Sequence, residues 1–517
     1  MDKVKILWAD DEIERLKPHL RFLEKKNYEV ITVSNGYDAL DECEAHSDID
    51  VVFLDESMPG LTGLETLDKI KKDYPFLPVV MITKNEAENV MEEALGAQIA
   101  DYLIKPVNPN QILLTLKRIT DNKRLIKDKT NSDYQQDFRT LMMEIQSGLD
   151  YEEWVETYKK IINWELKINA SGASEMSEIL NMQKVEAGNE FSKFIEKNYR
   201  DWLVNEDGPI RSNELLKEKV FPQMEDDIPT IFILLDNLRF DQWKVIEPII
   251  NEYFRVEKED YFYSILPTST QYSRNAIFAG MMPLDIQKHY PQYWVMDNEK
   301  EGKNNYEKEL LATQINRLIH RSIKFDYIKV TNIATAKELN DNILNYLNND
   351  FTAIVYNFID FLSHARTEME VLKELAGDEK AYRSITKSWF ENSTLWEALE
   401  KLSDKDVKII IGTDHGTIRV NQPSKVVGDR ETTTNLRYKS GKNLNYDSKD
   451  VLEITKPKEV GLPSANISTR YIFSKSNRFF LYPNNYNYYN KYYKDTFQHG
   501  GISLEEIICP VITLRPK

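Results

Sequence analysis

Short apolar runs, each followed at once by a polar or acidic residue, recur in two separate parts of the chain. Within residues 1–120 they are VKILWAD, YEVITVS, VVFLDES, PVVMITK and DYLIKP. From Ile231 onward they include IFILLDN, FTAIVYNFID, KIIIGTDHG and ICPVITLRP. Continuous apolar runs of this length are typical of parallel strands that are buried on both faces. The pattern therefore predicts two α/β domains, each with helices between its strands.

The stretch between the two sets has the spacing of helices. It contains DFRTLMMEIQSGL, YEEWVETYKKIINWELKI and EFSKFIEKNYRDWL, with few β-branched runs. We predict a doubly wound parallel-sheet domain at 1–120, a helical connector bundle at 121–225 and a larger α/β domain at 226–517. In the larger domain, residues 298–308 and 424–449 are predicted to be polar loops. The segment YPNNYNYYNKYYKD is predicted to be an ordered loop or a packing surface.

The composition limits where such a chain works and what it binds. With a formal net charge of -17, its surface repels nucleic acid at long range, so direct binding of duplex DNA is disfavoured. Cys43 and Cys509, the two cysteines, fall in different predicted domains, which excludes a disulfide framework. The sequence has neither an apolar run long enough for a membrane span nor a signal-peptide pattern. We therefore expect a cytoplasmic protein.

The residues that follow the strands of the first domain are suited to holding a phosphoryl group. In strand order they are Asp10 and Asp11, Asp55, Thr83 and Lys105. The carboxyl ends of parallel strands open onto one crevice, so these side chains are expected to meet. Three carboxylates can hold one Mg²⁺, and the metal and an ammonium group can neutralise a phosphoryl group on a carboxylate oxygen. One Asp alone could simply cap a helix, but the ordered set favours a phosphorylation site.

These residues, together with DESMPGLTG at 55–63, resemble the receiver domain of response regulators. The resemblance implies a CheY-like fold, with Asp55 as the phosphoacceptor and Mg²⁺ held by Asp10, Asp11 and Asp55. It also implies that Thr83 and Tyr102 act as a switch pair. Phosphorylation adds about -1.5 to -2 charges and can reshape the face near Tyr102. In this family that face usually forms a homodimer.

A second set of candidate ligands, three Asp and three His, lies beside the strands of the larger domain. They are Asp236, Asp360, His364, Asp414, His415 and His499. Carboxylate oxygen and neutral imidazole nitrogen are ligands that suit Zn²⁺. Two metal ions can hold both the attacking and the leaving oxygen of an in-line phosphoryl displacement. The segment LPTSTQYSRNAIFAG at 266–280 offers a hydroxyl nucleophile. Each motif alone is typical of a helix face, a turn or a loop, but the ordered set favours a metal site.

This arrangement resembles the alkaline phosphatase superfamily, and LLDNLRFDQW, PTST and HGGISLEEIICP resemble its PglZ family. The resemblance implies one zinc on Asp360, His364 and His499, and a second on Asp236, Asp414 and His415. It also implies the roles of the neighbouring residues. These are Thr270 as the nucleophile, Thr268 as a weaker candidate for it, and Arg239 and Arg274 as phosphate contacts. Asp285 and His289 have helical spacing but no match in that family, so they are interpreted as ordinary surface residues.

Two chemistries of this superfamily can be weighed from the residues. A sulfatase is disfavoured because no C/S-x-P-x-R motif lies near Thr270. Monoester and diester hydrolysis both stay open. A basic stretch at 419–442 is either a solvated loop or a surface for a nucleotide backbone. Its cationic residues are Arg419, Lys425, Arg430, Arg437, Lys439 and Lys442.

A receiver joined through helices to a PglZ-like domain resembles the PorX-like response regulators of the Bacteroidetes type IX secretion system. The resemblance implies three partners: a sensor histidine kinase, the cytoplasmic part of the secretion motor and an extracytoplasmic-function sigma factor. No basic recognition helix follows residue 120, so direct promoter binding is not supported. The hypothesis is an Asp55-controlled dizinc phosphodiesterase acting on cyclic or linear oligonucleotides. The alternatives are a zinc domain without turnover and a phosphorylation-gated adaptor.

Overall fold

The computed structural model describes most of the chain. It covers residues 3–46, 48–75, 77–84, 99–172, 174–205, 208–297, 299, 302–368, 377–429 and 431–517. The chain divides into two compact units. The first is Met1–Gln135 with Ala170–Ala173, and the second is Gln136–Asn169 with Ser174–Lys517. None of the described helices combines the length and the apolar character that crossing a membrane would require.

The first unit holds a five-stranded parallel sheet with the strand order β2-β1-β3-β4-β5. Its strands are β1 Val4–Ala9, β2 Tyr28–Val33, β3 Val51–Asp55, β4 Val79–Thr83 and β5 Asp101–Ile104. Its helices include α1 Lys17–Lys25, α2 Gly36–Ala45 and α3 Gly63–Asp73. Alternate residues of the strands pack on opposite sides, one against α2 and α3 and the other against α1 and the start of α5. Burial of every residue explains why β3 and β4 are apolar up to their last residue, whereas β2 and β5, at the edges of the sheet, are only partly buried.

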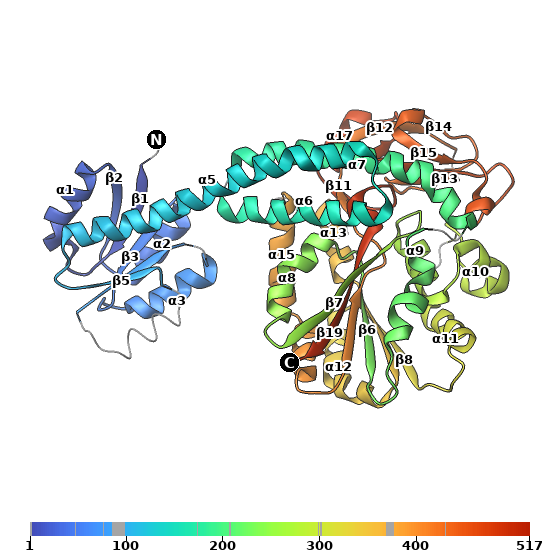
Figure 1. Ribbon diagram of the computed structural model, residues 1–517, viewed down its shortest axis with the longest axis horizontal. Helices are drawn as coiled ribbons and strands as arrows, with labels where there is room; N and C mark the ends of the chain where they lie inside the picture. The colour runs from blue at the N-terminus through green and yellow to red at the C-terminus, as the bar shows by residue number, and fades with distance from the viewer. Residues whose placement is uncertain are drawn as a thin grey trace. The chain divides into compact units, whose positions relative to one another are not determined.

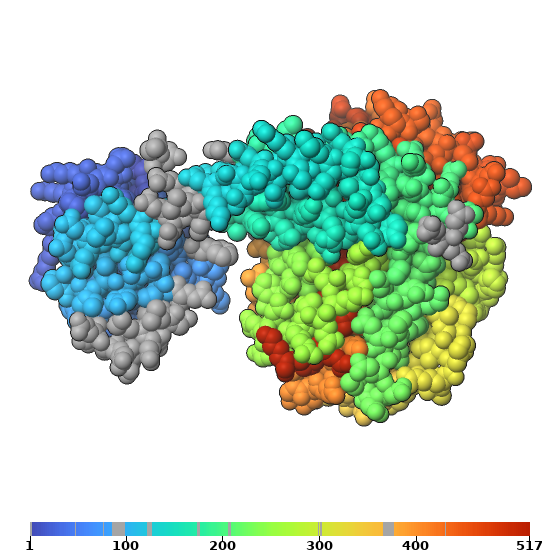
Figure 2. All heavy atoms as spheres, viewed as in Figure 1, coloured from blue at the N-terminus to red at the C-terminus, as the bar shows by residue number. Residues whose placement is uncertain are grey.

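Three long helices follow the first sheet, as the sequence predicts. They are α5 Pro109–Ser147, α6 Tyr151–Ser171 and α7 Ser174–Asn205. In the second unit, α6 and α7 pack directly on the α/β domain. The Tyr263 hydroxyl donates to the carbonyl of Tyr151 at 2.8 Å, and the Ser476 N–H donates to the hydroxyl of Ser192 at 3.1 Å. Figure 2 shows these helices, in cyan to green, in one continuous surface with the green atoms of the domain.

The second unit is built on a six-stranded mixed sheet with the order β7-β19-β10-β6-β9-β8. The strands are β6 Thr230–Leu235, β7 Phe254–Tyr263, β8 Phe325–Val330, β9 Phe351–Tyr356, β10 Lys408–Gly412 and β19 Ile508–Pro516. The four strands from β10 to β8 are parallel, and β19 runs antiparallel to both of its neighbours, β10 and β7. The four apolar runs of the sequence are β6, β9, β10 and β19, so the prediction of a second buried sheet is confirmed.

Helices cover both faces of this sheet (Figure 1). One face packs on α8 Phe240–Ile250, α12 Ile333–Asn342, α15 Glu379–Glu391 and α16 Thr394–Leu402. On the other side lie α9 Thr270–Ala279, α10 Pro283–His289 and α11 Glu307–Leu318. The remaining described α-helices are α13 Phe358–Glu368, α17 Tyr486–Tyr493 and α18 Leu504–Ile507.

Small strands gather at one end of the large sheet, where the sequence indicates polar loops (Figure 1). They are β11 Ile418–Arg419, β12 Gln422–Val427, β13 Tyr438–Gly441, β14 Asn445–Tyr446, β15 Val451–Ile454, β16 Arg470–Ser474, β17 Arg478–Leu481 and β18 Phe497–Gln498. The prediction of a loop at 424–449 is therefore wrong in part, because β12 pairs with β14 and β17. Only some residues of such short strands face inward, so their sequences lack the continuous apolar runs that indicate a buried strand.

A buried chain of charges ties the connector to the larger domain. Glu165 on α6 accepts from Lys184 on α7 at 2.7 Å and from Arg383 on α15 at 2.8 Å. Arg383 also donates to Asp241 on α8 at 2.9 Å. Burial opposes ionisation of Glu165, but the charges of Lys184 and Arg383 outweigh it and lower the pKa of Glu165 to about 2. The carboxylate is therefore held charged by the fold.

Replacing Glu165 with glutamine is expected to lower the free energy of unfolding by about 3 kcal/mol at pH 7, because it leaves buried cations without their partner. The folded pKa lies below the ordinary value of 4.5, so this stabilisation is complete above about pH 5 and disappears as pH falls towards 2. Urea unfolding at several pH values measures it. Glu156→Gln on the same helix is the control, since Glu156 is 65% exposed and pairs with Lys159 on the surface. If both substitutions lowered the free energy of unfolding equally, the buried ion pairs of Glu165 would not contribute more to stability than a surface pair.

Candidate functional site

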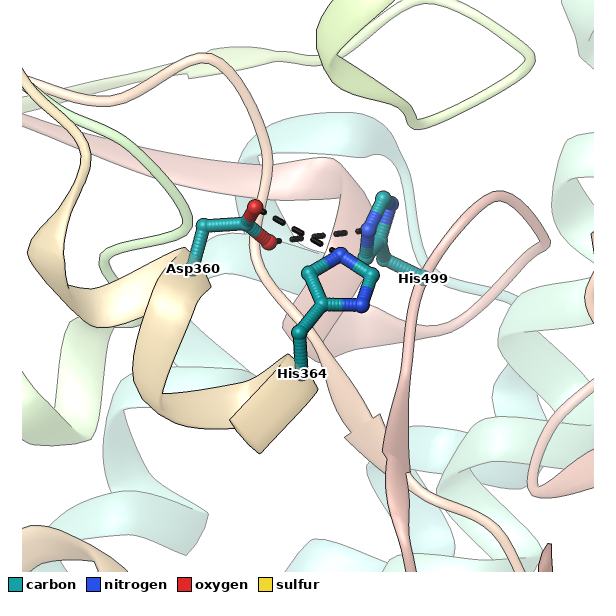
Figure 3. A group of neighbouring side chains, drawn as sticks. All are labelled: Asp360, His364 and His499. Carbon is teal, nitrogen blue, oxygen red and sulfur yellow. Dashed lines mark ion pairs between the residues drawn. The ribbon is translucent and has the colours of Figure 1, made fainter. Parts of the chain in front are cut away.

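The first group of ligand side chains in the second unit comprises Asp360, His364 and His499 (Figure 3). Asp360 and His364 lie one helical turn apart on α13, and His499 follows β18. Nε2 of His364 is 3.5 Å from one carboxylate oxygen of Asp360, and Nε2 of His499 is 3.7 Å from the other. One ligand atom from each residue lies within 4.8 Å of the other two. Three converging donors of this kind suit a metal ion.

The second group comprises Asp236, Asp414 and His415. Asp236 follows β6, and Asp414 and His415 follow β10, which is the parallel neighbour of β6. Nε2 of His415 is 3.9 Å from Oδ1 of Asp236 and 3.8 Å from Oδ2 of Asp414. The structure thus brings the six predicted ligands together in the two groups that the resemblance implies. The pairing of neighbouring parallel strands produces the second group directly.

Hydrogen bonds fix the two buried imidazoles with Nε2 as the ligand atom. Nδ1 of His415 lies 3.0 Å from the carbonyl oxygen of Gly416, and Nδ1 of His499 lies 3.2 Å from that of Thr268. Carbonyl oxygens only accept, so Nδ1 carries the proton in each ring. The rings stack with centroids 4.2 Å apart, and burial lowers the pKa of both residues. Neutral imidazole is the form that binds a metal ion.

The carboxylates of the site also fit a cation. Oδ2 of Asp414 is buried without a hydrogen-bond partner. Burial, followed by the charge of Asp236, raises the pKa of Asp414 well above its usual range. Burial also raises the pKa of Asp360 to about 6, and again the charge of Asp236 contributes. Such carboxylates are destabilising without a compensating charge, which a divalent ion would supply.

Asn237 connects the two groups, and the sequence interpretation overlooked it. Its backbone N–H donates to Oδ1 of Asp414 at 3.2 Å, and its side-chain amide donates to Oδ1 of Asp360 at 3.3 Å. The residue has φ 68°, a left-handed conformation that Asn adopts more readily than most residues. An Asn directly after the acidic end of a strand is the signal that could have identified it.

The two predicted nucleophiles have different surroundings. Oγ1 of Thr270, at the first position of α9, lies 3.1 Å from Nε2 of His415 and 3.5 Å from Oδ1 of Asp236. Thr268 is buried, and its hydroxyl donates to the carbonyl of Gly501 at 2.9 Å while accepting from the N–H of Gly500 at 3.1 Å. Thr270 is therefore next to the ligand atoms, and Thr268 holds the backbone beside His499.

Arg239 and Arg274, predicted to contact phosphate, are instead engaged in buried ion pairs. Arg239 pairs with Asp241 and Glu379. Arg274 pairs with Asp236 at 2.8 Å and with Glu307 at 2.5 Å. Both guanidinium groups already have carboxylate partners, since Arg239, the N-cap of α8, and Arg274, within α9, are buried next to acidic side chains. Arg274 positions a ligand carboxylate, and Arg239 neutralises acidic side chains behind the site.

A cavity of about 770 Å³ opens beside the first group of ligands. His364 and His499 line it at the ligand end, and Tyr492 and Tyr493 of α17 form another part of its wall. The other lining residues are Gln271, Asp297, Glu431, Thr432, Thr433, Thr434, Asn435, Leu436, Tyr438 and Gln498. Among these described lining residues there is no Lys or Arg. Asp297, which accepts from the Tyr272 hydroxyl at 2.7 Å, was not identified from the sequence.

The basic stretch at 419–442 is not one exposed cationic surface. Arg437 is buried and pairs with Glu506 at 2.6 Å. Lys439 is buried too, and burial lowers its pKa to about 8. Arg419 pairs with Asp495 at 3.3 Å. Arg430 lies outside the described residues, so the alternative of a nucleotide-binding surface in this stretch rests on fewer cations than the sequence indicates.

In the first unit, the predicted phosphorylation residues meet at the ends of the strands. Ligand oxygens of Asp10, Asp11 and Asp55 lie within 4.8 Å of one another. Nζ of Lys105 is 2.9 Å from Oδ2 of Asp10 and 2.9 Å from Oδ1 of Asp55. Oδ2 of Asp55 is buried without a hydrogen-bond partner, and burial raises the pKa of this residue, with Lys105 opposing the shift. Three converging carboxylates fit Mg²⁺.

The two predicted switch residues lie on neighbouring strands. Thr83 is the last residue of β4, and its hydroxyl donates to the carboxylate of Glu56, next to Asp55. Tyr102 lies on β5 beside Met81 of β4 and is partly exposed. The Thr83 hydroxyl would therefore have to leave Glu56 in order to bind a phosphoryl group on Asp55.

Comparison with known families accounts for nearly the whole chain. The profile of the BREX system PglZ alkaline phosphatase-like domain matches residues 215–514. The chain belongs to this PglZ family. The profile of the PorX response regulator linker domain matches residues 124–203, and that of the response regulator receiver domain matches 6–117. This order of domains is the PorX-like architecture. It supports a hydrolase of the alkaline phosphatase superfamily that is joined to a receiver domain. A receiver domain in turn implies a cognate sensor kinase.

Individual relatives share only part of the chain. The regulatory protein PhoP of Bacillus subtilis is 33% identical over 118 residues, which are 22% of this chain and 48% of that protein. CpxR of Escherichia coli is 31% identical over 131 residues, 25% of this chain and 54% of that protein. The chain thus matches about half the length of these relatives.

Solved structures of single receivers are similar to this chain over a comparable share of its length. One is the chemotaxis protein CheY4 of Vibrio cholerae, with 30% identity, a TM-score of 0.22 and coverage of 23% of this chain and 98% of that one. Another is a receiver domain from Clostridium thermocellum, with 31% identity, a TM-score of 0.23 and coverage of 24% and 98%.

Proposed function

We propose that the chain is a response regulator whose receiver, phosphorylated on Asp55, controls a two-zinc phosphodiesterase in its PglZ domain. The position of Thr270 supports this most strongly. Its hydroxyl is within 3.5 Å of ligand atoms of both Asp236 and His415, and the next residue, Gln271, lines a cavity large enough for a substrate. A nucleophile has to lie within reach of the groups that activate it.

The side chains have separable roles in this reaction. Zinc held by Asp236, Asp414 and His415, and by Asp360, His364 and His499, would supply Lewis-acid stabilisation of the phosphoryl oxygens. The Thr270 hydroxyl loses its proton to water, and its oxygen attacks phosphorus from the N-terminus of α9, where the helix dipole favours negative charge. The bond from phosphorus to the leaving alcohol oxygen breaks as the threonine ester forms, and a water molecule then hydrolyses this ester to regenerate the hydroxyl. Arg274 holds the carboxylate of Asp236 in position through the 2.8 Å ion pair.

The charge of the cavity favours diesters over monoesters. A phosphomonoester carries about -1.5 to -2 charges at neutral pH, whereas a diester carries one. The described lining residues include Asp297 and Glu431 but no cation that would neutralise a second charge. We therefore propose cyclic or linear oligonucleotides as the substrate class.

Regulation is proposed to start at the receiver. Mg²⁺ held by Asp10, Asp11 and Asp55 would allow phosphorylation by the kinase, Lys105 and Thr83 would hold the phosphoryl group, and the homodimer would form through the face near Tyr102. The PorX-type linker at 124–203 supports a role in type IX secretion, through the secretion motor or a sigma factor.

The test is hydrolysis of bis-p-nitrophenyl phosphate and p-nitrophenyl phosphate by the purified protein, with metal content measured on the same sample. Wild type should hold about two zinc ions in its three-ligand sites and prefer the diester. His364→Ala should lose one zinc and at least about 100-fold in kcat/KM, more than loss of a metal's outer-shell partner costs. His289→Ala is the control, because His289 is four residues from Asp285, as His364 is from Asp360, but lies outside the site. It should retain both zinc ions and the turnover of the wild type. Bound zinc without hydrolysis of either substrate would contradict the proposed phosphodiesterase activity. Equal effects of His364→Ala and His289→Ala would contradict the assignment of His364 to the zinc site.

A further inference from the structure

The segment 482–494 differs in chemistry from the rest of this acidic chain. It contains two lysines and no acidic residue, in a chain whose net charge is -17. Its sequence is otherwise made of Tyr and Asn with one Pro. The sequence interpretation expected a loop or packing surface, but residues Tyr486–Tyr493 form the helix α17. The helical spacing places tyrosines four residues apart on one face.

The tyrosine rings of α17 form two stacks. Tyr488 and Tyr492 have ring centroids 6.3 Å apart with planes 15° from parallel, and Tyr489 and Tyr493 have centroids 6.1 Å apart at the same angle. Tyr492 and Tyr493 line the cavity that also contains His364. Tyr488 is 65% exposed and Tyr489 39% exposed. The stacked rings therefore run from the wall of the cavity to the surface.

Packing accounts for only part of this arrangement. Tyr486 and Tyr493 pack against the cluster of Ile418, Val420, Phe479 and Leu481. Among the described residues, that cluster does not include the exposed rings of Tyr488 and Tyr489. Large exposed rings gathered on one face, next to a cavity, are typical of a binding surface.

Cations accompany the rings. Lys491 lies within α17, Lys494 directly follows it, and Nζ of Lys425 lies 4.9 Å from the ring centroid of Tyr486. Among the ion pairs of the described residues, none involves any of these three lysines. Their charge is thus available to an anionic ligand, in contrast to the buried cations of the neighbouring strands.

We propose that α17 is a base-stacking platform for a single-stranded oligonucleotide. Bases would stack on the rings of Tyr488 and Tyr492, and Lys491 and Lys494 would face the backbone phosphates, so that the strand leads into the cavity. Aromatic stacking with a nearby positive charge is how proteins bind single strands without sequence preference. The proposal rests on the phosphodiesterase proposed above and adds the surface that selects its substrate. A paired duplex does not present its base faces, so it is excluded from the platform.

The test measures binding rather than turnover. A fluorescein-labelled oligoribonucleotide of about ten residues, a length within the range that single-strand sites bind, is titrated by anisotropy into the full chain carrying Thr270→Val. A gel checks that the strand stays intact. Tyr488→Leu and Tyr492→Leu should each weaken binding at least about 5-fold, whereas Tyr488→Phe and Tyr492→Phe should stay within about 2-fold, because stacking needs the ring and not the hydroxyl. Tyr253→Leu, which removes a 41% exposed tyrosine elsewhere in the second unit, is the matched control.

Three results would overturn the platform: no binding by the Thr270→Val chain, leucine variants that bind like it, or a duplex that binds as tightly as the single strand. Loss of a protein partner in the leucine variants, with oligonucleotide binding unchanged, would assign the helix to protein recognition instead. Because no turnover is required, the platform can fail while diester hydrolysis holds. Diester hydrolysis can equally fail while the oligonucleotide still binds.

Discussion

Thr270→Val is expected to reduce kcat/KM for bis-p-nitrophenyl phosphate at least about 10³-fold, because removal of a nucleophile leaves only the contribution of the surrounding site. The substitution keeps the shape of the side chain and removes the hydroxyl that lies 3.1 Å from His415. The six ligand side chains stay in place, so zinc content and thermal unfolding should be those of the wild type. Thr270→Ser retains a hydroxyl and is expected to retain most of the turnover.

Thr268→Val is the matched comparison, since it changes the same residue type two positions away. Its hydroxyl makes two buried hydrogen bonds, to Gly501 and from Gly500, and their loss should cost about 1–3 kcal/mol of stability. We expect a lower melting temperature with more turnover than in Thr270→Val. The reverse result, with turnover lost in Thr268→Val and kept in Thr270→Val, would move the nucleophile to Thr268.

The sequence predicts the positions of the ligands because the fold places strand ends together by a general rule. Asp236 and Asp414 each end an apolar run, and parallel pairing of β6 with β10 brings them side by side. Asp360 and His364 share a helical turn, which their spacing alone predicts. His499 comes from a short antiparallel pair, β11 with β18, and only its family motif indicated it.

What the sequence could not predict depends on partners far away in the chain. Nothing around Arg239 or Arg274 signals that carboxylates on other helices occupy their guanidinium groups. Asp297 joins the cavity through Tyr272, which precedes it by 25 residues, without a local motif. The helix at Tyr486–Tyr493 lies in a segment that the sequence predicts to be an ordered loop or a packing surface, since Tyr and Asn favour helices only weakly.

Removal of zinc is expected to destabilise the second unit by several kcal/mol. An ion that binds only the folded state contributes about 4 kcal/mol when its free concentration is 1,000 times its Kd. The physical reason is the charge of the site. Burial raises the pKa of Asp360 and Asp414 above their usual values, so the folded chain holds these carboxylates at a cost that a bound cation relieves. A zinc-selective chelator should therefore lower the melting temperature of this unit by about 10 °C.

The design separates the zinc sites from the receiver and from catalysis. Mg²⁺ stays in the buffer, so the site formed by Asp10, Asp11 and Asp55 keeps its ion and the first unit should melt as before. Thr270→Val retains every zinc ligand and should respond to the chelator like the wild type, whereas His364→Ala should respond less because one site is already lost. If metal analysis shows that zinc has left and the melting temperature has not moved, the ions do not compensate the buried carboxylates. The raised pKa of Asp360 would then have to be tolerated by the fold itself, and a structural role for zinc would be excluded while a catalytic role stayed open.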